Sequence, residues 1–407
     1  MSIKDKMRPG FRNISGGLFE SVAKADVGDA FAGLAARGVT MLSWADPFYP
    51  DASTPPLVRE AIMQAYSDGT ASHYTMPVGN SELKKLIAEK VQRVNGLEVN
   101  PQRNILITPG SDSGLFYSMF PFIMEGDEVL ITDPCYPNNI QNVLLCGGQV
   151  VAVPLKAKFG FQPQPEDFEA RITEKTKMLV LTNPNNPSST VFSEESLLML
   201  AALCVKHDLI CVVDQAFEDM VYDGRKMVTM AALPGMFERT VTVFSISKGM
   251  GLSGYRLGYI VACDVIMDVL YGAAVTVLGA TNTAVQNAAI EAFRKPGFIE
   301  EYTAVFERRR HVIAQIIEGT PSVKMLLPES AFLCWIDVSS LGSSQEVCAY
   351  LLEHAKVSVN CGTAYGAEGE GHIRVVFGCL KDDEHLYDAF RRMAAAFTKL
   401  AAEKGIC

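Results

Sequence analysis

The sequence predicts an α/β protein with two structural parts. The larger part is a mostly parallel seven-stranded sheet between helices, and the smaller one is an α+β domain. The chain has 407 residues, which exceeds the ~100–200 residues of one ordinary domain. Short runs rich in Val, Ile and Leu alternate with longer helical patterns along the middle of the chain. The C-terminal part changes to long amphipathic patterns with short apolar runs between them.

The apolar runs show little alternation of apolar and polar residues, which is typical of strands buried on both faces of a sheet. We expect these strands at residues 104–108, 128–132, 149–154, 178–182, 209–214, 240–245 and 257–263. The helical stretches between them include residues 111–123, 136–145 and 194–207. Together they predict a large domain over residues 57–296.

The remaining elements predict a small domain over residues 297–407. Long amphipathic helices are expected at 297–319 and 382–404, and short strands near 331–338, 357–361 and 373–377. We expect the N-terminal segment, residues 1–56, to pack with this small domain.

Composition and charge argue against several classes of function, among them nucleic-acid binding, membrane spanning and metal binding. The chain has 36 Lys and Arg against 46 Asp and Glu, so its net charge is −10, and binding to nucleic acid is not expected. Apolar stretches are too short to cross a membrane, and the first residues do not resemble an export signal. The cysteines form no Cys-x-x-Cys pair, and the histidines lack metal-ligand spacing. We therefore expect a cytoplasmic protein without a metal site.

A glycine motif at residues 249–254 matches Gly-x-Gly-x-x-Gly and follows a predicted strand. In a dinucleotide site the third glycine opens a helix. Here Gly254 leads into another strand pattern, so nicotinamide binding is not indicated.

A lysine comes just before this glycine motif, in the segment Ser245-Ile-Ser247-Lys248. A lysine at the end of a buried strand loses hydration, which lowers its pKa and suits it to form a Schiff base. The hydroxyls of Ser245 and Ser247 and the guanidinium of Arg256 would suit a nearby phosphate. The alternative is a solvent-exposed loop lysine.

Polar residues follow other predicted strands as well. Asp214 closes an apolar run and is either a helix cap or the partner of a buried cation such as a pyridinium nitrogen. Residues 183–187, Asn-Pro-Asn-Asn-Pro, form a tight turn or aim an amide at a phenolic oxygen. Ser111 and Asp112 either cap a helix or help it bind an anion. Pyridoxal 5'-phosphate requires this combined set of groups.

The order of these motifs is also informative. From residue 39 to residue 377 the chain resembles the class I/II aminotransferases, pyridoxal-phosphate enzymes of fold type I in the aspartate aminotransferase superfamily. The segment Lys248-Gly-Met-Gly-Leu-Ser-Gly-Tyr-Arg256 resembles the lysine signature of that family. The resemblance implies that Lys248 holds the cofactor as a Schiff base and moves the substrate proton, while Ser245 and Arg256 hold the phosphate.

The same resemblance assigns roles to further residues. It places Asp214 on the pyridine nitrogen and Asn186 on the cofactor phenolate and the substrate. It also implies that Ser111 and Asp112 cradle the phosphate and that Tyr136 stacks on the ring.

The resemblance also implies how the substrate is bound and how subunits cooperate. Arg374 matches the arginine that pairs with the substrate α-carboxylate, and Ala45 stands where a glycine usually lines the substrate. Tyr74 matches a tyrosine that reaches the phosphate of the neighbouring subunit, which implies a homodimer with shared active sites.

Some positions depart from the family pattern. Phe217 replaces a tyrosine that donates to the phenolate, so we expect a more basic phenolate and a raised pKa of the Schiff base. Gln215 replaces an acid, and Ser189 replaces a glycine. Ala45 adds a methyl group that could narrow the substrate range.

The expected function is amino-group transfer between an L-amino acid and a 2-oxo acid. One alternative is a carbon–sulfur β-lyase on the same scaffold, because the same carbanion can expel a β-substituent. The other is a cofactor-binding regulator without turnover. The sequence leaves the identity of the donor amino acid open.

Overall fold

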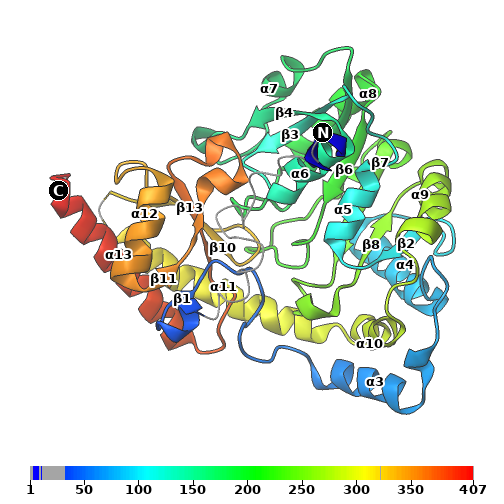
Figure 1. Ribbon diagram of the computed structural model, residues 1–407, viewed down its shortest axis with the longest axis horizontal. Coiled ribbons are helices and arrows are strands. Elements are labelled where there is room, and N and C mark those ends of the chain that lie inside the picture. The colour runs from blue at the N-terminus through cyan, green and yellow to red at the C-terminus, as the bar shows by residue number, and fades with distance from the viewer. Residues whose placement is uncertain (1–2, 9–10, 12–32, 321, 407) are drawn as a thin grey trace.

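The computed structural model describes residues 3–8, 11, 33–320 and 322–406 of the chain. Its centre is a seven-stranded sheet with helices on both faces (Figure 1). Across the sheet the strands are β2 (Ile105–Thr108), β8 (Gly258–Val261), β7 (Thr240–Ser245), β6 (Ile210–Asp214), β5 (Thr176–Thr182), β3 (Glu128–Asp133) and β4 (Gln149–Pro154). Strand β8 is antiparallel to both neighbours, and the other pairs are parallel. The expected mostly parallel sheet is confirmed.

The predicted strands coincide with the observed ones to within about two residues. Strand β8 is shorter than expected because the chain leaves the sheet after Val261 and Cys263 becomes the N-cap of α9 (Asp264–Val277). Two strands, β4 and β7, begin and end as predicted.

Successive residues of a strand point to opposite faces of the sheet. Since both faces therefore carry apolar side chains, helices cover both of them. Val129 and Ile131 of β3 pack in one apolar core, whereas Leu130 packs in another. The first core contains α9, α5 (Ser111–Met119) and α6 (Pro137–Cys146). The opposite face is covered by α7 (Pro165–Glu169), α8 (Glu194–Lys206), α4 (Ser81–Asn95) and α10 (Thr283–Arg294), with α3 (Pro56–Ser67) packed against α10.

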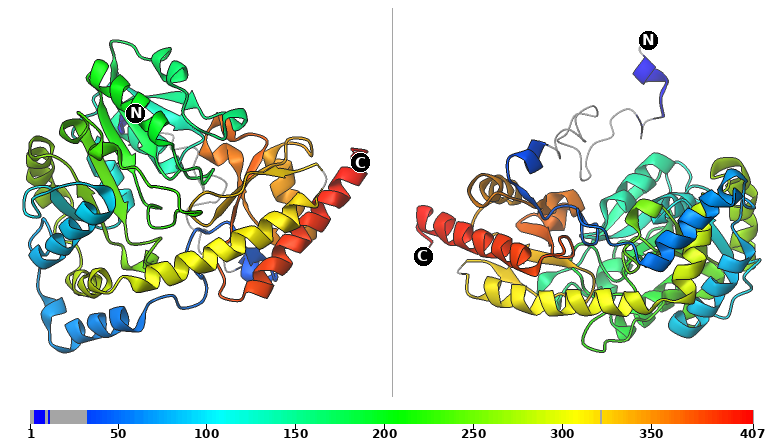
Figure 2. Two further views of the ribbon diagram at one scale, coloured as in Figure 1. Left: turned by 180° about the vertical axis from the view of Figure 1, so that it is seen from behind. Right: turned by 90° about the horizontal axis from the view of Figure 1, so that it is seen from below.

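A smaller sheet follows toward the C-terminus. Its strand order is β12 (Asn360–Cys361), β13 (His372–Val376), β10 (Leu333–Asp337) and β9 (Lys324–Met325), all antiparallel. The long helices α11 (Gly297–Glu318) and α13 (Asp383–Glu403) lie side by side next to it (Figure 2). The described residues of this part also form α12 (Ser344–Tyr350), which a π-helical turn at Leu351–Ala355 follows directly.

The strand expected at 357–361 is divided in two. Its first half, β11 (Val357–Ser358), pairs in parallel with β1 (Thr40–Met41) from the N-terminal part. Its second half, β12, pairs with β13 instead. One sequence run therefore serves two sheets, because its halves meet different partner strands.

The division into 1–56, 57–296 and 297–407 stays a prediction. Residues 1–2, 9–10 and 12–32 of the expected N-terminal segment lie outside the described residues. In the part of the chain that the structure describes, no helix combines the length and the apolar character that crossing a membrane requires.

Candidate active site

The carboxyl ends of β5, β6 and β7 lie at one edge of the sheet because these strands are parallel. Asp214 ends β6, Ser245 ends β7, and Asn186 lies in the loop after β5. Topology alone therefore gathers three of the predicted residues at this edge. Lys248 follows three positions after Ser245 in the loop toward β8.

Lys248 is half-buried, and its Nζ donates a hydrogen bond to the carbonyl of Ala45, 2.6 Å away. Burial lowers the pKa of Lys248 to about 8, although the negative charges of Asp112 and Asp46 act in the opposite direction. An amine with this pKa is in part neutral near pH 7, which a nucleophilic lysine requires.

Asp214 is only 4% exposed, and its Oδ1 accepts a hydrogen bond from the Ala216 backbone N–H at 3.1 Å. Burial raises the pKa of Asp214 to about 7, because the ionised form loses hydration. Among the described residues no lysine, arginine or histidine forms an ion pair with this carboxylate. A buried carboxylate of this kind suits a cationic ligand group such as a ring nitrogen.

The expected phosphate-binding end of the site lies at the start of α5. The preceding Gly110 has a φ of 85°, and a Cβ there would come within 2.6 Å of Arg256 Nη2. Arg256 also forms an ion pair with Asp112 Oδ2 at 3.5 Å. Gly258 approaches the Ser111 backbone nitrogen so closely that a Cβ would lie 2.7 Å from it. The helix N-terminus and the guanidinium are thus side by side.

Ser245 joins this group through the sheet. It is the register partner of Gly258, which touches the start of α5. Its side-chain oxygen accepts a hydrogen bond from the Ser247 backbone N–H at 3.1 Å. The hydroxyl, the guanidinium and the free N–H groups of α5 form a suitable set of donors for a phosphate.

Tyr136 is held in one orientation by polar neighbours. Its hydroxyl donates to Asp112 Oδ1 at 2.9 Å, and Asn138 Nδ2 donates to both of these oxygens at 3.0 and 3.1 Å. Burial raises the pKa of Tyr136 well above its ordinary value. The phenol of Tyr136 is therefore neutral near pH 7, which suits the stacking on the cofactor ring that we expect of it.

Arg374 of β13 is 2% exposed and makes only neutral contacts. Its Nη1 donates to Asn186 Oδ1 at 3.1 Å, and its Nη2 donates to the Ser43 carbonyl at 3.1 Å. Nε and Nη2 both donate to Asn360 Oδ1, at 3.2 and 2.7 Å. The guanidinium carbon lies 5.0 Å from the centroid of the Tyr365 ring. Within the described chain no carboxylate neutralises this buried charge, so it is available to an anionic ligand.

The positions that depart from the family pattern have local explanations. Ser189 has a φ of 58°, a left-handed conformation that favours glycine, and its hydroxyl donates to the Leu333 carbonyl at 2.8 Å. Phe217 is buried and packs edge-on against Phe332 with ring centroids 5.5 Å apart. Ala45 is half-buried and provides the carbonyl that Lys248 contacts.

Gln215 belongs to a buried polar cluster behind the site. Its Nε2 donates to Glu218 Oε2 at 2.6 Å and to Thr229 Oγ1 at 3.1 Å. Glu218 in turn pairs with Lys90, and Asn95 Nδ2 donates to Glu218 Oε2 at 2.6 Å. This cluster therefore ties α4 to the segment that follows Asp214. Sequence reasoning missed it, because nothing in the pattern of α4 marks a buried lysine.

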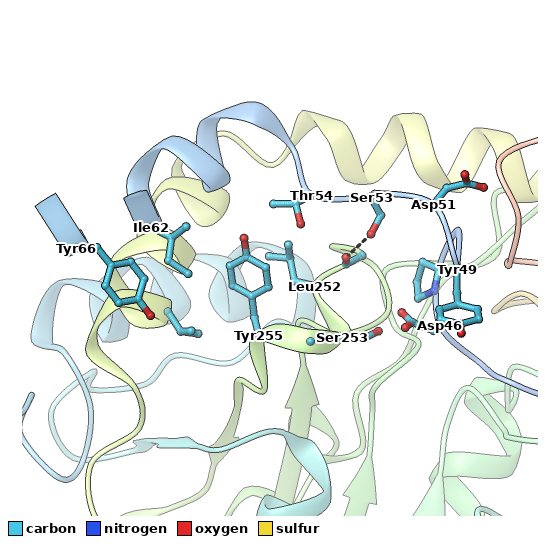
Figure 3. Close-up of a pocket in the computed structure, with 14 residues that line it drawn as sticks. Asp46, Tyr49, Asp51, Ser53, Thr54, Ile62, Tyr66, Leu252, Ser253 and Tyr255 are labelled. Carbon is cyan, nitrogen blue, oxygen red and sulfur yellow. Dashed lines mark hydrogen bonds between the residues drawn. The ribbon is translucent and has the colours of Figure 1, made fainter. Parts of the chain in front are cut away.

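A cavity of about 520 Å³ opens beside the loop that follows Lys248 (Figure 3). One wall is the segment 46–54 and another is the loop 251–255, and Ser53 joins them by donating to the Gly251 carbonyl at 2.9 Å. Asp46, the residue after Ala45 in the sequence, is one of the lining residues. The cavity adjoins the lysine loop, but Lys248, Asp214 and Arg374 are not among its lining residues.

Tyr74 is a predicted site residue, but within one chain it does not lie near the other predicted site residues. It is 96% exposed, and no hydrogen bond of its side chain to the site is present in the described structure. Conversely, Asn360 and Asn138 contact site residues but were missed. No sequence signal could have found Asn360, since only the β12–β13 register places it opposite Arg374.

The residues present fit pyridoxal phosphate. A partly neutral lysine, a buried carboxylate without an ion pair in the described chain, a helix start beside a guanidinium and an arginine that contacts no described carboxylate lie around one edge of the sheet. These are the donors and acceptors that an aldehyde, a ring nitrogen, a phosphate and a substrate carboxylate need.

Comparison with known proteins identifies the family of this chain. The family described as aminotransferase class I and II matches residues 38–392. Aromatic-amino-acid aminotransferase 2 of Thermococcus litoralis is 33% identical over 350 residues, which cover 84% of this chain and 88% of that protein. Arginine–pyruvate transaminase AruH of Pseudomonas aeruginosa is 31% identical over 368 residues, covering 90% and 91% respectively.

A solved structure shows the same fold. Aspartate aminotransferase from Thermus thermophilus with maleate superimposes with a TM-score of 0.85 at 29% identity, covering 97% of this chain and 99% of that chain. The expected fold and the expected amino-transfer activity are thereby confirmed. The chain belongs to the class I and II aminotransferases, a pyridoxal-phosphate-dependent family that acts on amino acids and 2-oxo acids.

Proposed function

We propose that this aminotransferase binds pyridoxal 5'-phosphate covalently through the Lys248 amine and transfers an amino group from an L-amino acid to a 2-oxo acid. The observation that carries the proposal is that Lys248 and Asp214 follow neighbouring parallel strands at one edge of the sheet. Burial lowers the pKa of Lys248 to about 8, and the buried Asp214 carboxylate forms no ion pair in the described chain. When bound, the cofactor supplies an electron sink for a carbanion at the substrate α-carbon.

The residues of this chain have distinct roles in the proposal. Asp214 would hold the ring nitrogen through its ionised carboxylate, and that contact would offset the cost of burying the charge. Ser245, Arg256, Asp112 and the backbone at Ser111 hold the phosphate end. Asp112 acts there by orienting Arg256, with which it forms an ion pair at 3.5 Å.

Substrate binding is proposed to rest on Arg374. Its guanidinium has five N–H groups, and four of them donate to Asn360, Ser43 and Asn186. The α-carboxylate would take the remaining Nη1 N–H and displace one of these contacts to form a second, parallel hydrogen bond. Asn186 contacts the same guanidinium and is proposed to orient the cofactor oxygen and the substrate. With the cofactor bound, the Lys248 amine would act as the general base that removes the α-proton and as the general acid that delivers it to the former aldehyde carbon of the cofactor.

The covalent role of Lys248 is tested by borohydride reduction of the loaded protein, followed by peptide mapping. We expect the cofactor mass on the peptide that contains Lys248 and not on exposed lysines such as Lys226. The variant Lys248→Arg keeps the charge and is expected to lose both the label and keto-acid formation. Label found elsewhere while position 248 stays unmodified would overturn the proposal.

We further propose a homodimer in which Tyr74 completes the neighbouring active site. Its 96% exposure leaves its hydroxyl free to reach another subunit. The inactive variants Tyr74→Ala and Lys248→Ala should complement each other after subunit exchange. Random exchange would restore about a quarter of the sites, since half of the dimers are mixed and each mixed dimer holds one intact site. Complete absence of recovery in verified mixed dimers argues against shared sites.

A further inference from the structure

Two thiols lie together beside the predicted carboxylate-binding arginine. Cys348 is on α12 and Cys361 is on β12, and α12 packs against this strand. The interaction between the two thiols is the largest influence on the pKa of each. Both residues are half-buried rather than enclosed, so small reagents can reach them. Neither takes part in the mechanism proposed above.

The surroundings of Cys361 favour its thiolate. Hydrogen bonds from Cys348 and from Thr363, whose Oγ1 lies 3.0 Å from the Cys361 sulfur, lower the pKa of the Cys361 thiol to about 6. Burial and the negative charge of Glu370 act in the opposite direction. The thiolate is the nucleophilic form of cysteine, and a second thiol in contact with it can resolve an oxidised sulfur into a disulfide.

A second pair of thiols provides an internal comparison. Cys204 and Cys211 also interact with each other, but both are completely buried in an apolar core. The interaction with Cys204 and burial both raise the pKa of Cys211, and burial also excludes reagents from it. In both pairs the two thiols are therefore close to each other. Only the pair that contains Cys361 is accessible to reagents and has a thiol whose pKa is lowered.

The position of Cys361 connects it to Arg374. Its neighbour Asn360 accepts two hydrogen bonds from Arg374, at 3.2 and 2.7 Å. Asn360 and Cys361 together form the whole of β12, an edge strand paired only with β13 in the described chain. A disulfide that draws Cys361 toward α12 would therefore also move Asn360, the residue that holds the Arg374 guanidinium.

We propose that Cys348 and Cys361 are an oxidation site, at which a peroxide converts the two thiols to a disulfide, and that this disulfide weakens substrate binding at Arg374. The Cys361 thiolate attacks one peroxide oxygen and becomes a sulfenic acid, releasing the other oxygen as water or an alcohol. The Cys348 sulfur then attacks the Cys361 sulfur and expels water. Two thiols are oxidised by two electrons, and the peroxide is reduced by two. The effect on binding rests on the role proposed for Arg374.

Peptide mapping tests the disulfide without requiring turnover. The cofactor-loaded protein is treated with hydrogen peroxide, blocked with N-ethylmaleimide and digested without reductant. We expect a linked peptide that contains Cys348 and Cys361 and that separates on addition of dithiothreitol. Cys204 and Cys211 should stay reduced. Absence of the linked peptide from wild-type protein overturns the proposed site.

Kinetics then test the consequence. Oxidation should raise KM for the amino acid about tenfold, the effect of weakening one hydrogen bond to a charged group, and dithiothreitol should restore it. Cys348→Ser and Cys361→Ser should abolish the response, whereas Cys204→Ser should keep it. A disulfide that leaves KM unchanged, or a response that survives in both serine variants, refutes the link to Arg374. A linked peptide in a protein without transaminase activity would refute the proposed function and leave the oxidation site standing.

Discussion

The lowered pKa of Lys248 predicts how fast the unloaded protein captures its cofactor at each pH. The perturbation is pH itself, because only the neutral amine attacks the cofactor aldehyde. An ordinary lysine has a pKa of 10.5, whereas burial lowers that of Lys248 to about 8. At pH 7 this difference makes the neutral fraction about 300-fold larger than for an ordinary lysine.

The assay mixes unloaded protein with excess pyridoxal phosphate and follows the growth of visible absorption between about pH 6 and about pH 10. The rate should rise with pH and level off above a midpoint near 8, since the pKa is lowered and deprotonation is complete beyond it. The same measurement with a free amino compound of ordinary pKa corrects for titration of the cofactor.

A charge variant sharpens this test. The negative charge of Asp112 is the largest electrostatic influence that raises the pKa of Lys248. Asp112→Asn should therefore move the midpoint to lower pH, and the exposed Asp268→Asn should leave it unchanged. A wild-type midpoint near 10.5, or a midpoint that rises in Asp112→Asn, would refute the reasoning.

Further predictions concern the other parts of the site. Arg374→Lys should raise KM for the amino acid roughly 10- to 100-fold while the visible absorption of the cofactor persists, because lysine lacks the planar fork; unchanged KM would contradict this. Phe217→Tyr should lower the pH midpoint of that absorption by donating to the phenolate, and an unchanged or raised midpoint would count against the expected effect of the phenylalanine. Lys90→Met should cost about 3–5 kcal/mol in urea unfolding, because the buried Glu218 loses its partner. Adding Glu218→Leu to that variant should recover much of the loss, and additive losses would show that the ion pair is not the cause.

Much of the fold could be predicted from the sequence because its strands are buried on both faces. A strand such as β7, Thr240–Ser245, needs apolar residues along its whole length, and that requirement is visible in one dimension. The candidate site residues could be predicted from the sequence for the same reason. Lys248 and Asp214 are polar residues at the ends of apolar runs, where burial makes a charge costly and therefore informative.

Contacts between distant segments could not be predicted. The strand expected at 357–361 serves two sheets, and the sequence does not contain the identity of its partners β1 and β13. The exposed position of Tyr74 likewise follows from where α3 and α4 place the segment between them.

By itself, the sequence determined the α/β class, the approximate bounds of the strands and the residues able to carry the reaction, since each depends on local burial. Only the tertiary structure decided which groups hold those residues in place. The pairing of Arg374 with Asn360, the contact between Lys248 and Ala45 and the meeting of Cys348 with Cys361 all join segments through strand register or helix packing. Such contacts depend on how the chain closes in three dimensions, and a linear pattern carries no record of them.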